Sequence, residues 1–167
     1  MTATIPGRAV VPLLLACFVT GCGAAWEGAR LRDAQTRHGE AILDLSTTLR
    51  VSATRICPEL AGALAGRRCD ARQCRADERR ERVAAAHSHA QRETHFILGV
   101  YTAKLAWNDL DARDSTWTVT LHMDGVRAPA GTILALRDRD AHARLFPELD
   151  GFDEAYEVSF PVAYVES

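Results

Sequence analysis

The feature that most constrains the fold of this chain is a set of short runs in which apolar and polar residues alternate. Between residues 42 and 57, every second residue from Leu43 to Ala53 is apolar or threonine, and the residues between them are polar or charged. A period of two is typical of a strand that buries one face. Later strand-like runs occupy residues 95–107, 115–126, 132–140 and 154–164.

A helical excursion interrupts these runs at residues 59–94, which contain no run of Val, Ile and Phe. The second half of this stretch is rich in Ala, Arg and Glu, all good helix formers. Its pattern predicts one exposed helix from about Ala71 to Glu93. Glu78 and Arg82 form a favourable pair one turn apart on this helix, which indicates a solvated, salt-bridged face.

The runs show no strand-helix-strand alternation, so the predicted fold is mainly β. We expect a small antiparallel, immunoglobulin-like β-sandwich with one exposed helical excursion. Asp124-Gly125 predicts a tight hairpin inside it. A chain of 167 residues, 47% of them hydrophobic, has room for one domain. We place this domain at residues 42–167, with the helical insertion at 59–94, and expect residues 22–41 to be a tether with a short helix.

The N-terminus carries the clearest signal about location. Arg8 precedes a run of twelve residues, 9–20, that contains no charged side chain. Such a run is too short for a membrane-spanning helix, which needs about 20 residues. A positive charge, a short apolar run and then small residues are the layout of a secretory signal peptide. We place this signal peptide at residues 1–21.

The last residues of the apolar segment, VTGC at positions 19–22, resemble the lipobox of bacterial lipoproteins. The resemblance covers residues 1–26. It implies that Cys22 carries a diacylglycerol on its thiol, that cleavage occurs just before this cysteine, and that the new amino terminus receives an acyl chain such as palmitate. Gly23, in a position where aspartate would favour the inner membrane, implies the outer membrane of a Gram-negative cell. A cleaved signal without lipid and a retained first helix are the alternatives.

Three cysteines follow the lipobox: Cys57, Cys69 and Cys74. The environment beyond the inner membrane is oxidising, so we expect one disulfide among the three, with all three pairings open. A metal site made of these thiols is not expected, because the spacing of Cys69 and Cys74 differs from that of a zinc knuckle and no fourth ligand is assigned.

Acidic residues gather in two predicted loops: Asp109, Asp111 and Asp114 in one, and Asp138, Asp140, Asp150, Asp153 and Glu154 in the other. If the strands alternate in direction and residues 126–137 form one strand, both loops lie at the same end of the sandwich, where they could bind calcium. Arg113 breaks the EF-hand pattern. We therefore interpret these acids as solvated turn residues and predict no metal site, with Asp109, Asp111, Asp114, Asp150 and Asp153 as the candidates if one exists.

His87 and His89 lie near His95 in the sequence. Residues two apart on a helix point about 200° apart, so His87 and His89 cannot share one metal ion there. We expect both to be solvated.

The sequence contains no Gly-x-Ser-x-Gly elbow, no glycine-rich phosphate loop and no HExxH motif. The 20 Lys and Arg residues nearly balance the 22 Asp and Glu residues, so no overall field attracts nucleic acid. The sequence predicts a membrane-anchored cell-envelope lipoprotein that acts as a non-catalytic binding or adaptor module for an unknown envelope protein, with no cofactor besides its covalent lipid. The alternative is a small lipid-anchored enzyme or a calcium-dependent binding domain that uses the acidic loops.

Overall fold

The computed structural model describes residues 26–44, 47–123, 125–138, 142, 144–149 and 153–163. Residues 1–25, which include the predicted signal peptide and Cys22, the predicted lipidation residue, lie outside these ranges, as do Asp124, Asp140 and Asp150. In chain order the elements are α1 (Glu27–Gln35), β1 (Thr36–Asp44), β2 (Thr47–Arg55), α2 (Pro58–Arg72), α3 (Ala76–Arg92), β3 (Thr94–Thr102), the 3-10 turn η1 (Leu105–Trp107), β4 (Thr120–Met123), β5 (Val126–Pro129), β6 (Thr132–Ala135) and β7 (Glu154–Phe160). No helix in these ranges is both long and apolar enough to cross a membrane.

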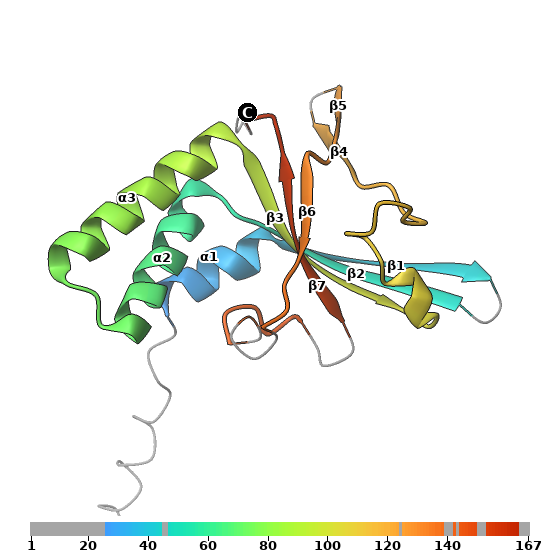
Figure 1. Ribbon diagram of the computed structural model, residues 1–167, viewed down its shortest axis with the longest axis horizontal. Coiled ribbons are helices and arrows are strands. Elements are labelled where there is room, and N and C mark those ends of the chain that lie inside the picture. The colour runs from blue at the N-terminus through green and yellow to red at the C-terminus, as the bar shows by residue number, and fades with distance from the viewer. Residues whose placement is uncertain are drawn as a thin grey trace, which may run out of the picture.

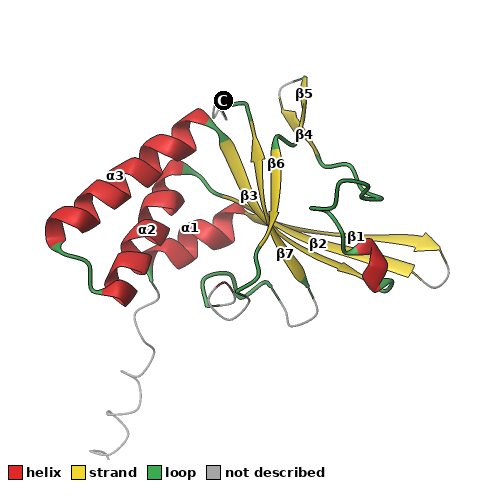
Figure 2. Cartoon of the chain, viewed as in Figure 1, coloured by secondary structure: helices red, strands yellow, loops and turns green. Residues whose placement is uncertain are grey.

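One antiparallel sheet of five strands organises the molecule. Its strands lie in the order β1-β2-β3-β7-β6, so β3 is central and β1 and β6 are the edges. β4 and β5 pair with each other as a separate hairpin, which Figure 1 shows beside β6. The three α-helices gather at one end of the sheet (Figure 2).

The two faces of the sheet pack against different layers, because successive residues of a strand point to opposite sides. We call one side the helix face; its core consists of Cys57, Leu60, Leu64, Ile97, Phe146, Leu149 and Ala155. We call the other side the hairpin face; its core consists of Leu98, Val100, Leu110, Ala128, Tyr156, Val158 and Phe160. The central strand β3 contributes to both cores.

α2 is a core helix that the sequence analysis did not identify. Pro58 fits its first position, where the missing backbone N–H would have no helical partner. Leu60 and Leu64, one turn apart, are 0% and 5% exposed in the helix-face core. The side of α2 that faces α3 carries small residues. A Cβ added to Gly62 would lie 3.5 Å from the side chain of Val83 on α3. Two leucines and a small-residue surface therefore suffice to bury a helix whose pattern is weakly apolar.

The predicted antiparallel sheet is confirmed. The prediction that the fold is mainly β is wrong. Helix and strand make up nearly equal shares of the chain. Helices and the segment 144–149 cover the helix face, where a sandwich would have its second sheet. The small β4–β5 hairpin covers the other face. Its expected tight turn is confirmed, since Gly125 adopts φ +79° between the two strands.

α3 is confirmed as an exposed helix, since none of its residues is buried. Arg82 Nη2 lies 2.8 Å from Glu78 Oε1 on its surface, as their spacing predicts. The helix begins at Ala76 rather than near residue 71, because α2 extends to Arg72. A disulfide between Cys69 and Cys74 closes the link between α2 and α3.

Two strand assignments differ from the expectation. The run at residues 42–57 belongs to two antiparallel strands, β1 and β2, rather than to one. β1 also takes in residues 36–41, which we expected to be tether. This edge strand has both faces in solvent over residues 37–42, so no apolar alternation marks it. The condition that residues 126–137 form one strand, on which the placement of the acidic loops depended, is not met, because this range contains β5 and β6 in different sheets.

Candidate functional site

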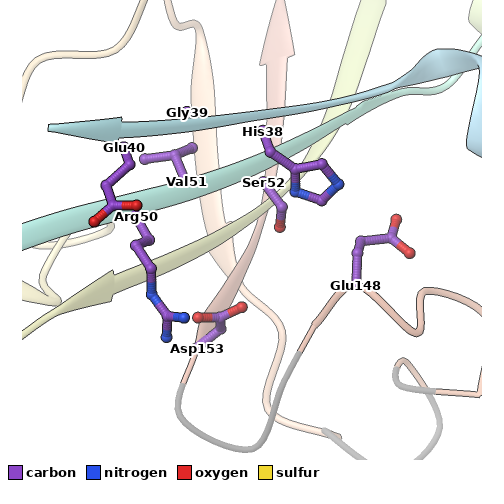
Figure 3. A pocket seen from close by; sticks show the side chains of 8 residues that line it. All are labelled: His38, Gly39, Glu40, Arg50, Val51, Ser52, Glu148 and Asp153. Carbon is purple, nitrogen blue, oxygen red and sulfur yellow. The ribbon is translucent and has the colours of Figure 1, made fainter.

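A polar pocket of about 280 Å³ lies on the helix face, beside the edge formed by β1 and β2. Its lining comes from β1 (His38, Gly39 and Glu40), from β2 (Arg50, Val51 and Ser52) and from the segment before β7 (Glu148 and Asp153). Arg50 and Ser52 point to the same side of β2 because they are two residues apart. Figure 3 shows the guanidinium of Arg50 directed toward the carboxylate of Asp153.

The segment 144–149, one wall of the pocket, is fastened to the sheet by apolar and polar contacts. Phe146 is 1% exposed in the helix-face core. Arg32 of α1 donates a hydrogen bond of 2.9 Å to a backbone carbonyl of this segment, and its Nε lies 3.7 Å from Oε2 of Glu148. Thr54 on β2 donates a hydrogen bond of 2.6 Å to Oε1 of Glu148. Glu148 therefore holds the wall in place as well as lining the pocket.

Gly99 on β3 lets this wall approach the sheet closely. A Cβ at this position would lie 2.5 Å from Ser52 Oγ, 2.6 Å from Leu149 Cδ2 and 3.2 Å from Asp153 Oδ2. The first two distances are shorter than van der Waals contact allows, so any larger residue would push the wall outward. The glycine is thus what brings Asp153 and Ser52 to one place.

Ser52 has an unsatisfied environment. The residue is 7% exposed, and its hydroxyl oxygen is buried with no hydrogen-bond partner in the structure. Buried hydroxyl groups almost always have a partner, and leaving one without costs about 1–3 kcal/mol. Because Ser52 lines the pocket, a polar ligand atom bound there can supply the missing partner.

The charged groups around the pocket have a small negative excess. Glu40, Glu148 and Asp153 contribute three carboxylates, Arg50 contributes one guanidinium, and Arg32, 3.7 Å from Glu148, contributes a second. Asp153 is itself buried at the back of the pocket. This arrangement favours a ligand that carries a positive charge together with hydrogen-bonding groups, since an anion would meet net repulsion.

The two acidic loops follow β3 and precede β7, so they lie at the same end of the sheet, but their acids divide between its two faces. Asp109 and Asp111 lie near the phenol of Tyr156 on the hairpin face, where burial, and then the charge of Asp111, raise the pKa of Tyr156 to about 12. Asp153 lies in the pocket on the helix face. Glu154, the next residue, contributes its charge on the hairpin face, where it also raises the pKa of Tyr156. Among the acids that the structure describes, Asp109, Asp111, Asp114 and Asp153 form no cluster of metal-ligand atoms.

The cysteines divide into a pair and a single thiol. Cys69 and Cys74 form the disulfide, and Cys57 is free and buried in the helix-face core. Burial raises the pKa of the Cys57 thiol. A raised pKa disfavours the thiolate, which is the form that reacts and binds metal. Cys57 is therefore a packing residue.

The histidines have separate surroundings on α3. His87 Nε2 lies 4.0 Å from Glu59 Oε1, whereas the ring of His89 lies 4.7 Å from the ring of His95. The divergence of His87 and His89 follows the expected helical geometry. His95 is buried at the start of β3, and the close approach of His89 to it was not expected.

Sequence reasoning missed most of the pocket. The alternation in residues 42–57 predicts that Arg50 and Ser52 face solvent, and the tether predicted at residues 22–41 contains His38 and Glu40. The spacing of these residues could have indicated the pocket. Arg50 and Ser52 are two residues apart, as are His38 and Glu40, so each pair lies on one face of its strand. This face meets Glu148, which is about a hundred residues later in the chain. Periodicity describes neighbouring residues only, so it cannot predict such a contact.

Comparisons with known proteins add no relative: no protein-family model, no curated protein and no solved structure matches the chain.

Proposed function

We propose that this protein is a membrane-anchored cell-envelope lipoprotein whose folded part is a non-catalytic binding module. The anchor is supported by the lipobox-like residues 19–22. The binding role is supported by the polar pocket, and above all by the buried Ser52 hydroxyl that lacks a partner inside it. A ligand atom that forms a hydrogen bond with this hydroxyl would remove the cost of burying it without a partner.

The ligand that best fits is a small cation, either a free polar molecule or one basic side chain of an envelope protein. The pocket volume of about 280 Å³ is near the lower limit of about 300 Å³ for small-molecule sites. Glu40 offers a carboxylate to an ammonium or guanidinium group, and Ser52 offers a hydroxyl. Charge-assisted hydrogen bonds of this kind are about twice as strong as neutral ones.

The proposed anchor would hold the module close to a membrane. Trp26, the first described residue, packs against the helix-face core and is four residues from Cys22. Four residues span at most about 14 Å when fully extended. Lipidation at Cys22 would place the domain at the membrane face, which we propose to be that of the outer membrane of a Gram-negative cell. Several acyl chains make such an anchor lasting.

The pocket is tested by the melting temperature of the purified full chain in detergent as a function of agmatine concentration, at constant ionic strength. Agmatine is a small cation with a guanidinium and an ammonium group. A ligand that binds the folded state raises the melting temperature with its concentration. We expect this rise in the wild type, and expect Ser52→Ala and Glu40→Gln each to reduce it strongly.

Glu81→Gln is the matched control, because it removes the same charge from the exposed surface of α3. Its response to agmatine should equal that of the wild type. A melting temperature that does not respond to agmatine, or a response that Ser52→Ala and Glu40→Gln leave intact, would contradict the proposed pocket.

A further inference from the structure

A second group of potential ligands lies where α3 leads into β3. His89 and Glu93 are four residues apart, and the chain then turns into the strand, which brings His95 back toward both. One side-chain nitrogen of each histidine and one oxygen of Glu93 lie within 4.8 Å of one another. His89 is exposed, Glu93 is half-buried and His95 is buried, so the group is open to solvent on one side.

The imidazole of His95 has a nitrogen that lacks a partner. His95 is 8% exposed, and its Nε2 is buried without a hydrogen bond. Oε2 of Glu93 is 3.6 Å from this atom, beyond hydrogen-bonding distance. A buried ring nitrogen beside a carboxylate and a second imidazole has the neighbours that a zinc-binding nitrogen has.

The other ring nitrogen of His95 faces a different carboxylate. Nδ1 lies 3.9 Å from Oε1 of Glu157 on β7, which is also beyond hydrogen-bonding distance. Histidines that bind metals usually direct their second nitrogen toward a carboxylate. Glu157 lies on the Nδ1 side of the ring, and Nε2 is the nitrogen that faces Glu93.

The ionisation of His95 is compatible with this role. Burial, and secondarily the neighbouring His89, lower the pKa of His95, against the opposing influence of Glu157 and Glu93. Burial thus disfavours the protonated ring, which is the form that cannot coordinate a metal.

We propose that His89, Glu93 and His95 bind a zinc ion, with Nε2 of His95 as the buried ligand. Two imidazoles and one carboxylate are a known zinc donor set, in which water takes the fourth position. Tetrahedral zinc with bonds of about 2.0–2.2 Å needs its ligand atoms about 3.4 Å apart. Neither His89 nor Glu93 is buried, so rotation of their side chains can shorten the distances between the three ligand atoms to this value. The site is separate from the pocket and independent of its function.

The experiment is a zinc titration of the full chain, purified in detergent without a polyhistidine tag and stripped of metal by a chelator. Competition with a chromophoric chelator gives the affinity and stoichiometry. We expect one zinc ion per chain, and expect His89→Ala and Glu93→Gln each to weaken binding by about 100-fold or more. Both positions are outside the core, so both variants should fold.

His87→Ala is the matched control, because it removes a histidine of the same helix that lies outside the group and near Glu59. It should bind zinc as the wild type does. Absence of saturable binding overturns the proposal, as does an equal loss in His87→Ala or an unchanged affinity in His89→Ala. Cobalt(II) in place of zinc checks the ligand types: a thiolate charge-transfer band would assign Cys57 to the site and overturn the proposed set.

Discussion

Among the residues that the structure describes, three have a buried side-chain atom without a hydrogen-bond partner: Ser52, His95 and Asn108. Asn108 is fixed by its other amide atom, since Oδ1 accepts hydrogen bonds from the backbone N–H and the hydroxyl of Thr102, at 3.1 and 2.9 Å. Its role is to brace the end of β3. Ser52 and His95 differ because each adjoins charged side chains at an accessible site. A missing partner thus indicates a ligand only in such surroundings.

The first prediction compares two neighbouring hydroxyl groups on β2. Ser52→Ala removes a hydroxyl without a partner, so the unliganded protein should become more stable by about 1 kcal/mol. Thr54→Val removes a hydroxyl that donates to Glu148 at 2.6 Å, so stability should fall by about 1–3 kcal/mol. Urea unfolding of both variants measures the two free energies. A loss of stability in Ser52→Ala would mean that its hydroxyl has a partner in the unliganded protein.

Among the helices and strands, the ones that have a buried face and an apolar pattern could be predicted from the sequence. β3 and β7 carry alternating large residues toward the hairpin face, and their pairing is regular. α2 and β1 were not predictable from pattern. α2 depends on Leu60, Leu64 and small residues that fit against α3, and β1 is an edge strand whose one neighbouring strand is β2. In both, contacts with neighbours stabilise the element more than its own composition does.

The candidate sites were predictable only in fragments. The sequence marks His89 and His95 as near neighbours, but helical geometry alone says nothing of the turn that brings β3 back to α3. The pocket likewise joins β1, β2 and the segment before β7. The close packing at Gly99 that assembles it has no sequence pattern, because it depends on which side chains lie opposite.

The second prediction concerns the relative stability of α2 and α3, the two consecutive helices. α3 buries no residue, whereas α2 buries Leu60 and Leu64 in the helix-face core. Segments with few buried contacts open more often. Amide hydrogens in the middle of α3 should therefore exchange faster than those in the middle of α2 and in β3, as measured by native-state hydrogen exchange. Equal protection of α2 and α3 would show that the two helices open as one unit and that α3 contributes to the core.

At the scale of the whole molecule, both candidate sites use the helix face of the sheet. His95 and Gly99 lie on the same side of β3, four residues apart, a separation of about 13 Å along the strand. The segment that would connect the domain to a lipid joins the same layer, since Trp26 packs against the helix-face core. The hairpin face carries Tyr156 and the acidic loop around Asp111.

The central claim, that a lipid on Cys22 anchors this binding module, is tested most directly by labelled fatty acid incorporation in cells that express Cys22→Ser. We expect the variant to lose the label and to keep its signal segment, so that it runs larger on a gel. Cys17→Ser, within the apolar run, should behave as the wild type. Labelled, membrane-bound Cys22→Ser, or an unlabelled wild type that is released as a soluble protein, would contradict the anchor and with it the account of where this pocket acts.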